Sequence, residues 1–510
     1  MQLGEQLEAA GDHNAAVLQF GMALQAFNDT AALDPIRFGV PVDMVKALRL
    51  LGRQEEAMIL SQKLYEQYPN SRDVIRQLAV SYREMGDYAA ARDTLAHNEP
   101  FFKNSPALLQ DMAELTYYAG QHERAFKMLN DELKTPNHPA IPVLLYHGIT
   151  LSDRQDTVPL QKFREQLLAL KQAGYQTISI PEFLGFLEGR TTLPPNPILI
   201  TFDDARSDSF KYADPVLAET GFKATMFVPV GDVARHQPYA AVWPIIKNMF
   251  DTGRWDMQCH GTNAQHNVAV NAEGHLGHFL ANRMWIPDAA RLETNAEFAG
   301  RIEQDMLTCK ETLAHEVPGA NIVAFAFPYG DQGHRSLSNT QEAFNINQAA
   351  VKKQFSLAFN VDNNDLVTTT TPRYSLPRFE VPRSFSGQDL VLQLKKIDPE
   401  LSTAHTLAHL DVESGRYGEA LEIMDSLTQS GSFDNTELLT TSGKVLGWSG
   451  DHAGARNRLN QALALRPNDP LIQKEIDELN TRIQPKVDIS GLYFQDNAHR
   501  SYYSLSPSSQ

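Results

Sequence analysis

The stretch Asn196-Pro197-Ile198-Leu199-Ile200-Thr201-Phe202 is a short apolar run that ends in the paired carboxylates Asp203-Asp204. Similar runs, rich in β-branched or aromatic residues and bounded by Gly, Pro or Asp, recur at 142–146, 225–228 and 323–327. Stretches with helical periodicity separate these runs. Buried strands that alternate with helices indicate an α/β fold with a parallel sheet or barrel, whose functional residues follow the carboxyl ends of the strands.

The adjacent carboxylates Asp203 and Asp204 predict a metal site. Successive strand residues point to opposite faces, so both side chains can reach one site only where the strand gives way to a loop. Two like charges beside an apolar strand are costly unless a cation or a proton lies between them. A metal that is bound by one carboxylate, with the other beside it, removes this cost. An acidic first turn of a helix is the alternative interpretation.

Before this region the chain repeats itself. Gly52, Gly86 and Gly120 are spaced 34 residues apart, which is the period of the tetratricopeptide repeat. Each glycine suits the turn between the two helices of a unit, where a positive φ is needed. An alanine follows each glycine by five positions and permits close helix packing, at Ala57, Ala91 and Ala125. An earlier, irregular unit is predicted around Gly11 and Ala16.

The same signature returns near the carboxyl end, at Gly415 with Ala420 and at Gly450 with Ala455. Repeats of this kind stack into a solenoid that binds partners and carries no chemistry. We therefore predict repeats over 1–138 and 396–485 and a central domain over 139–395. The tail 486–510 alternates loosely and resembles the first strand of an outer-membrane β-barrel, with a disordered tail as the alternative.

Three motifs in the central domain resemble those of the polysaccharide deacetylases, the NodB-homology family. They are Thr201-Phe202-Asp203-Asp204, Trp255-Asp256-Met257-Gln258-Cys259-His260-Gly261 and Phe325-Ala326-Phe327-Pro328-Tyr329-Gly330. The opening Leu144-Leu145-Tyr146-His147 is similar to the subgroup that deacetylates poly-N-acetylglucosamine. The resemblance covers about residues 140–390 and implies a distorted (β/α) barrel, flanked here by all-α tetratricopeptide solenoids.

The resemblance also implies roles for individual residues. Asp204, His260 and His266 would bind a divalent metal, and Asp203 would be the general base. Zn²⁺ is favoured, with Co²⁺, Ni²⁺ or Fe²⁺ as alternatives, because one carboxylate and two imidazoles leave a position open for water. The backbone N–H of Tyr329 would hold the oxyanion. Residues expected to contact the sugar are Pro328, Tyr329 and Arg378.

The sequence departs from the family pattern at two places near the metal ligands. Five residues stand between His260 and His266, whereas the family often separates its histidines by three or four residues. His275 and His278 are therefore rival ligands. The usual glycine after the carboxylate pair is Ala205, which predicts a different loop conformation.

The fifth family motif normally supplies a histidine as general acid, but the corresponding region 376–381 has none. His147 is the leading candidate for the acid, with a purely structural histidine as an equal alternative, and His334 is a weaker candidate. Asp362 and Asp365 could tune the site or be ordinary loop residues. Three tryptophans are interpreted as core residues, with stacking on sugar rings as the alternative: Trp243, Trp255 and Trp285.

Composition narrows the partners. The chain has 510 residues with 62 acidic and 45 basic side chains, a formal net charge of −17, and no long basic run, so we expect no nucleic-acid partner. Apolar runs are too short for a transmembrane helix. Cys259 and Cys309 form no disulfide framework or metal motif. The first residues lack the pattern of a signal peptide, which taken literally indicates the cytoplasm.

These observations predict a metal-dependent hydrolase that removes N-acetyl groups from an amino-sugar polymer similar to poly-N-acetylglucosamine, in exopolysaccharide or biofilm export. The expected location is the periplasm or cell envelope of a Gram-negative bacterium, if the chain is a fragment. The repeats would recruit protein partners, and 139–395 alone would act on short substrates. The alternative is an impaired deacetylase fold that binds polysaccharide and acts as a scaffold.

Overall fold

The computed structural model describes residues 40–69, 71–98, 105–134, 139–151, 157–333, 338–362, 365–430, 435–483, 488–495 and 501–508. The predicted repeat around Gly11 and the candidate acid His334 lie outside these residues. The chain divides into two compact units, of which the first ends at Thr403 and the second begins at Ala404. The first unit holds both the amino-terminal repeats and the central domain.

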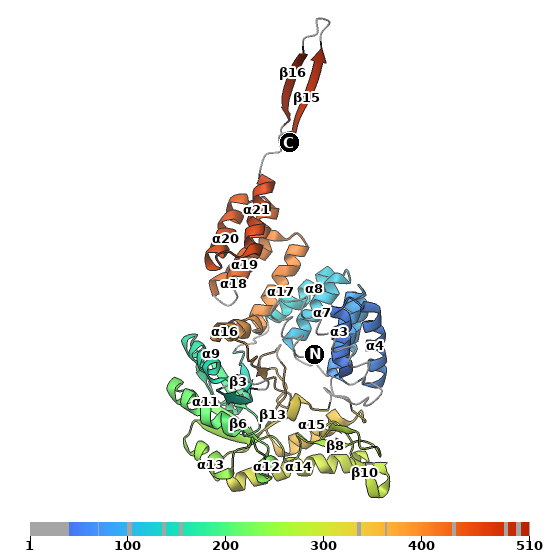
Figure 1. The fold of residues 1–510 in the computed structure, drawn as a ribbon, viewed down its shortest axis with the longest axis vertical. Helices are drawn as coiled ribbons and strands as arrows, with labels where there is room; N and C mark the ends of the chain where they lie inside the picture. Colours follow the sequence, from blue (N-terminus) through green and yellow to red (C-terminus); the bar gives the residue numbers. More distant parts are fainter. Residues whose placement is uncertain are drawn as a thin grey trace. The chain divides into compact units, whose positions relative to one another are not determined.

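A parallel sheet forms the core of the central domain (Figure 1). Its main strands lie in the order β13 (Leu357–Phe359), β12 (Ala324–Ala326), β7 (Trp255–Cys259), β6 (Ala224–Val228), β5 (Pro197–Phe202), β1 (Val143–Tyr146) and β14 (Phe379–Glu380). A further strand, β4 (Gln176–Thr177), pairs with β5. Every one of these pairings is parallel, as the alternation of apolar strands and helices predicted.

The two ends of this sheet meet along an irregular seam, which we define as residues 358–362 and 376–378. Leu376 N–H donates to the carbonyl of Ala358 at 2.9 Å, and Asn360 N–H donates to the carbonyl of Leu376 at 2.9 Å. Asp362 N–H then donates to the carbonyl of Arg378 at 3.0 Å. These bonds join β13 and the residues after it to the residues that lead into β14. Because β13 and β14 are the two edge strands, the sheet closes into a distorted barrel. The predicted fold class is confirmed.

Helices pack around the barrel because their apolar faces need burial. They are α9 (Leu160–Gln172), α10 (Ile180–Leu187), α11 (Ser207–Thr220), α12 (Val230–Ala234), α13 (Trp243–Asp251), α14 (Asn295–Glu316), α15 (Ala343–Gln354) and α16 (Gly387–Lys396). The longest, α14, begins at a capping box in which Thr294 and Glu297 each bond the other's backbone N–H. Between α13 and α14 the chain forms short strands and a 3-10 turn.

The other strands of the domain pair locally and stay outside the barrel sheet. They are β2 (Gly148–Thr150) with β3 (Thr157–Pro159), β8 (Asn267–Ala269) with β9 (Leu276–His278), and β10 (Trp285–Ile286) with β11 (Arg291–Leu292). Two 3-10 turns complete the domain, η2 (Pro287–Ala289) and η3 (Pro328–Gly330). The third sequence motif therefore ends in η3, directly after strand β12.

Three helix pairs form the described part of the amino-terminal repeats (Figure 1, blue to cyan). They are α3 (Val40–Leu50) with α4 (Gln54–Gln67), α5 (Arg72–Glu84) with α6 (Tyr88–His97), and α7 (Pro106–Tyr118) with α8 (His122–Leu133). Gly52, Gly86 and Gly120 occupy the turns with φ of 72°, 80° and 80°, a conformation that favours glycine. The predicted alanines are fully buried between helices: Ala57, Ala91 and Ala125.

The carboxyl-terminal repeats have the same construction. Their helices are α17 (Pro399–Glu413), α18 (Tyr417–Ser430), α19 (Asn435–Ser449), α20 (His452–Leu465) and α21 (Pro470–Ile483). Gly415 and Gly450 again have positive φ at the turns, and Ala420 and Ala455 are fully buried. In the tail, β15 (Asp488–Gln495) and β16 (Ser501–Ser508) form an antiparallel hairpin. None of the helices in the described ranges is long and apolar enough to cross a membrane.

Candidate active site

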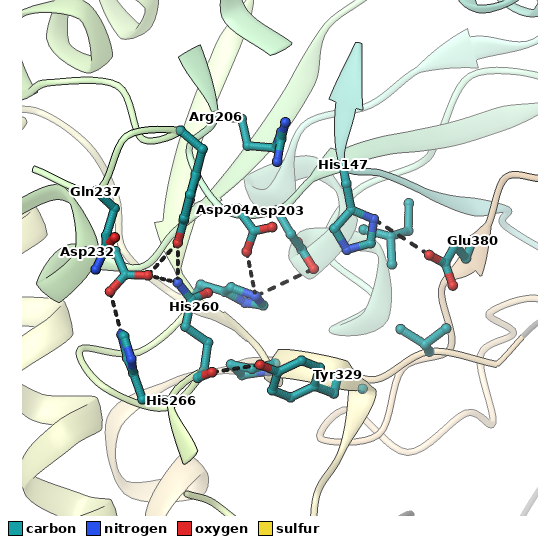
Figure 2. Close-up of a pocket in the computed structure, with 16 residues that line it drawn as sticks. His147, Asp203, Asp204, Arg206, Asp232, Gln237, His260, His266, Tyr329 and Glu380 are labelled. Atoms are coloured by element: carbon teal, nitrogen blue, oxygen red, sulfur yellow. Dashed lines mark hydrogen bonds and ion pairs between the residues drawn. The ribbon is translucent and has the colours of Figure 1, made fainter. Parts of the chain in front are cut away.

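A pocket of about 600 Å³ opens at the carboxyl ends of the barrel strands. It brings together the strand ends that the sequence motifs occupy, as expected for a barrel of parallel strands. Its lining is rich in carboxylates and imidazoles (Figure 2). The lining residues are Leu145, His147, Asp203, Asp204, Arg206, Asp232, Gln237, Tyr239, His260, Gln265, His266, Pro328, Tyr329, Gly330, Val361 and Glu380.

Asp203 is buried directly after β5, and Arg378 holds it. The two guanidinium nitrogens donate to the two carboxylate oxygens at 2.6 and 2.7 Å. Burial would raise the pKa of Asp203, but the charge of Arg378, followed by that of His260, outweighs it and lowers the pKa to about 2. Asp203 therefore stays ionised. Arg378, expected to contact the sugar, is fully buried and does not line the pocket, so it acts on the site through Asp203.

The turn after β5 directs both carboxylates into the same pocket. Asp204 and Ala205 adopt φ of 72° and 48°, the left-handed region that residues with a Cβ rarely occupy. The loop thus makes the turn for which the family uses a glycine, although an alanine stands there. Strain at two consecutive residues is typical of functional sites, where the surrounding structure enforces it.

His260 follows β7 and faces the two carboxylates (Figure 2). Its Nε2 lies 3.7 Å from Asp203 Oδ2 and 3.8 Å from Asp204 Oδ1. Its Nδ1 lies 2.9 Å from the carbonyl oxygen of Ala326, and a carbonyl only accepts, so Nδ1 carries the proton. The lone pair of Nε2 is therefore directed at the carboxylates, an arrangement that metal-ligating histidines commonly have.

His266 also lines the pocket but contacts residues other than Asp203 and Asp204. Its Nε2 is 2.6 Å from Asp232 Oδ1 and 2.8 Å from Arg235 Nη2. Asp232 is buried and also accepts hydrogen bonds from Arg235, Tyr239 and Gln265. Burial would raise the pKa of Asp232, but the hydrogen bonds from Tyr239, His266 and Arg235 outweigh it and lower the pKa. The structure thus pairs His266 with Asp232.

The rival ligands lie away from Asp204. His275 Nδ1 is 2.7 Å from the side-chain amide of Asn271 in the turn between β8 and β9. His278 Nδ1 is 3.2 Å from Asp331 Oδ2, and its ring stacks on Tyr329 with centroids 4.3 Å apart. Neither histidine lines the pocket.

The remaining candidates divide between the pocket and the core. His147 follows β1 at the pocket wall, and its Nδ1 is 3.6 Å from Glu380 Oε1. Pro328 and Tyr329 form another wall, with the Tyr329 hydroxyl donating to the carbonyl of Gln265 at 2.7 Å. The tryptophans do not line the pocket; Trp255 is buried against Phe202 and Phe210, and Trp243 packs on the same core.

Sequence reasoning missed two acidic residues of the pocket, Asp232 and Glu380. Asp232 is in α12, directly after strand β6, so its place at the carboxyl end of a barrel strand was the available signal. Glu380 is in β14, in the region that was searched for the missing histidine of the fifth motif. Both are isolated carboxylates in sequence, and no spacing pattern marks them.

The donor set fits a divalent metal in part. Ligand distances of about 2.0–2.2 Å place two ligands of one Zn²⁺ about 3–4 Å apart, which the separation of Asp204 Oδ1 and His260 Nε2 satisfies. The protonated Nδ1 of His260 suits this role. Across the described ranges, however, no three His, Cys, Asp or Glu side chains are gathered closely enough to hold a metal ion. His266 is the expected ligand that is missing from the group.

The strand-end pocket of the barrel thus gathers Asp203, Asp204 and His260 from the sequence motifs. Residues 190–346 match the family model described as polysaccharide deacetylase, and 44–71 and 73–96 match that of the tetratricopeptide repeat. The chain therefore carries a polysaccharide deacetylase domain together with tetratricopeptide repeats, as the motifs indicated.

The chain is similar over 305 residues, at 23% identity, to the poly-beta-1,6-N-acetyl-D-glucosamine N-deacetylase of Escherichia coli (strain K12). This match covers 56% of the chain and 43% of that relative, so the chain spans less than half of its length. A de-N-acetylase from Aggregatibacter actinomycetemcomitans is 17% identical with a TM-score of 0.43, covering 49% of this chain and 98% of that one. The BpsB deacetylase domain from Bordetella bronchiseptica is 19% identical with a TM-score of 0.40, covering 48% and 96%.

Proposed function

We propose that the chain is a metal-dependent hydrolase that removes N-acetyl groups from an amino-sugar polysaccharide similar to poly-N-acetylglucosamine, in exopolysaccharide or biofilm export. The observation that carries the proposal is the convergence of Asp203, Asp204 and His260 in one pocket. The name of the Escherichia coli relative supports the choice of substrate.

Asp204 and His260 would hold the metal. His266 would be the third ligand once its side chain leaves Asp232 and binds the ion. A divalent metal bound there would polarise the acetyl carbonyl and lower the pKa of a water. Zn²⁺ is our first choice, with Co²⁺, Ni²⁺ or Fe²⁺ as alternatives. Asp232 is a rival ligand that the pocket suggests and that the motifs did not.

The protein groups would move the protons of the hydrolysis. Asp203, ionised and oriented by Arg378, would accept a proton from the attacking water. The backbone N–H of Tyr329 would donate to the oxyanion that forms as the new C–O bond is made. His147, beside Glu380 at the pocket wall, would give a proton to the departing nitrogen as the C–N bond breaks. The products are acetate and a free amine on the sugar.

The sugar chain would lie against Pro328 and Tyr329, and Tyr329 is the more suitable platform because 54% of it is exposed. Deacetylation creates cationic amines, which the net charge of −17 would attract. We place the protein in the periplasm or envelope of a Gram-negative bacterium, with the cytoplasm as the alternative. The repeats would bind protein partners.

A second candidate function is polysaccharide binding by a deacetylase fold with impaired chemistry, with the repeats as a scaffold. The pairing of His266 with Asp232, away from Asp204, favours this alternative. It predicts little metal in the purified protein and no turnover, but retained binding of the polymer.

One experiment separates the two functions. The full chain is purified, saturated with Zn²⁺, analysed for bound metal, and incubated with short acetylated β-1,6-glucosamine oligomers, while released acetate is measured. We expect about one metal per chain and acetate release that Asp203→Asn slows by about 10²–10⁴-fold. Polymer binding without metal or acetate release would overturn the enzyme and support the scaffold.

A further inference from the structure

The amino-terminal repeats contact the central domain through two buried carboxylates. Arg72 Nη2 lies 2.5 Å from Asp362 Oδ2, and Arg76 Nη2 lies 3.6 Å from the same oxygen. The two arginines are one turn apart on α5 and therefore share a face. The side chains of Arg72 and Asp362 are 12% and 4% exposed, so this ion pair is protected from solvent screening.

A second contact lies beside the first. Asp365 accepts hydrogen bonds from the hydroxyl of Ser105 at 2.7 Å and from the backbone N–H of Ala107 at 3.2 Å. Ser105 is the N-cap of α7, so the carboxylate meets the positive end of that helix. Burial, and then the charge of Asp362, raise the pKa of Asp365 to about 6. Two buried carboxylates this close are costly, and partners from the repeats offset the cost.

The same segment continues into the candidate active site through the seam. Asp362 N–H donates to the carbonyl of Arg378, and the carbonyl of Asn360 accepts from Arg378 Nε at 3.2 Å. The guanidinium of Arg378 then holds Asp203 by both oxygens. Between Asn360 and Asp362, Val361 lines the pocket itself. The segment 360–362 therefore makes two contacts. The side chain of Asp362 contacts the repeats, and the backbone of the segment contacts Arg378, the partner of the candidate base.

We propose that the amino-terminal repeats are a positioning element of the deacetylase site, with Arg72 and Asp362 as positioning residues. Arg72 holds Asp362, the seam holds Arg378, and Arg378 orients Asp203. This inference rests on the proposed function for its kinetic consequence. It departs from the expectation that 139–395 alone is sufficient, because that fragment would lack the cation that Asp362 faces.

The test uses the full chain with Arg72→Met, which removes the guanidinium but keeps an unbranched side chain. The matched control is Arg53→Met, because Arg53 is an exposed arginine of the same repeats that pairs with Glu56. Hydrogen–deuterium exchange of the peptide 376–381 and steady-state kinetics on short acetylated oligomers are measured for the metal-loaded proteins, together with metal content.

We expect faster exchange at 376–381 and a kcat about 10- to 100-fold lower in Arg72→Met, since small misplacements of catalytic groups have effects of this size. KM and metal content should remain near those of the wild type, and Arg53→Met should change neither exchange nor kcat. Arg72→Lys should have a higher kcat than Arg72→Met, because lysine keeps the positive charge but lacks the planar guanidinium group. Asp362→Asn should reproduce Arg72→Met, and the double variant should be no worse than either single one.

Unchanged exchange at 376–381 in a folded Arg72→Met protein would overturn the inference, and so would an unchanged kcat. If Arg72→Met does not fold, Asp362→Asn and Ser105→Ala give the same readouts with smaller changes. A wild-type chain that releases no acetate would refute the proposed function, whereas the exchange experiment would still decide whether the repeats hold the seam.

Discussion

Arg378 and Asp203 form a buried ion pair in which Arg378 Nη1 donates to Asp203 Oδ1 at 2.6 Å and Nη2 donates to Oδ2 at 2.7 Å. The side chains are 0% and 4% exposed. A buried carboxylate without such a partner would be protonated or strongly destabilising. The candidate base therefore owes its charge to a residue 175 positions later in the chain.

Replacing Arg378 with Lys should move the acid limb of the pH–rate profile to higher pH. Burial raises the pKa of Asp203, and the charge and hydrogen bonds of Arg378 are the main counterweight. Lys keeps one charge but loses the fork, so the pKa should rise from its value of about 2. The measurement is kcat/KM of metal-loaded Arg378→Lys against pH. A limb at the wild-type position would show that Arg378 does not control Asp203.

Asp203→Asn should retain metal and lose deacetylation. The amide keeps the shape of the side chain but cannot accept a proton, so we expect a loss of about 10²–10⁴-fold in kcat. Metal content is measured alongside acetate release, because the proposed ligands are Asp204 and His260. Near-normal turnover would exclude Asp203 as the base, and loss of metal would make it a ligand instead.

His266→Ala should lose bound metal if His266 is the third ligand. Asp204→Asn and His260→Ala are the positive controls, and His275→Ala and His278→Ala should keep full occupancy because these histidines bond elsewhere. Metal content is determined by elemental analysis after gel filtration. Full occupancy in His266→Ala combined with loss in Asp232→Ala would transfer the role to Asp232.

Asp256→Asn should stabilise the fold at neutral pH but not in acid. Burial raises the pKa of Asp256 in β7 to about 6, although its side chain accepts a bond from Gln258. A raised pKa favours the protonated folded form, so the wild type loses stability as pH rises from about 4 towards about 6, and the deficit is constant above that. We expect a gain of about 1–2 kcal/mol, discounted because the carboxyl is partly exposed.

The check is the unfolding free energy from urea denaturation of both proteins at several pH values. The advantage of Asp256→Asn should appear between about pH 4 and about pH 6 and vanish below about pH 4. An advantage that is the same at every pH would mean that the amide improves packing and that the titration of Asp256 is not its cause.

Local patterns predicted the repeats and the barrel strands well. Gly86 has a positive φ in a turn, and Ala91 is fully buried between helices. Both requirements are local to the repeat, so the sequence alone predicts these residues. The same holds for the run 197–202, whose residues are all buried. The proximity of Asp203, Asp204 and His260 could also be predicted, because they follow strands and parallel strands place their ends together.

Partners that come from distant segments could not be predicted in this way. Arg378 was expected at the sugar, but its side chain turns inward because a buried carboxylate lies within its reach. The pairing of His266 with Asp232 depends on where α12 lies in the fold, and the spacing of residues in the sequence does not predict that position. For Asp362 the sequence left open whether it tunes the site or is an ordinary loop residue, because its partner Arg72 comes from a distant helix, α5.

The seam has a consequence for synthesis of the chain on the ribosome. Asp203 and the strand before it emerge long before Arg378, so a nascent barrel lacks both its closing edge and the cation for its central carboxylate. Domains generally fold as units, and pairings between distant segments form slowly. A nascent chain that stops short of residue 378 therefore cannot hold an ionised Asp203 in its interior. The candidate active site can therefore be completed only after residue 378 has been made, later than the amino-terminal repeats that contact the seam.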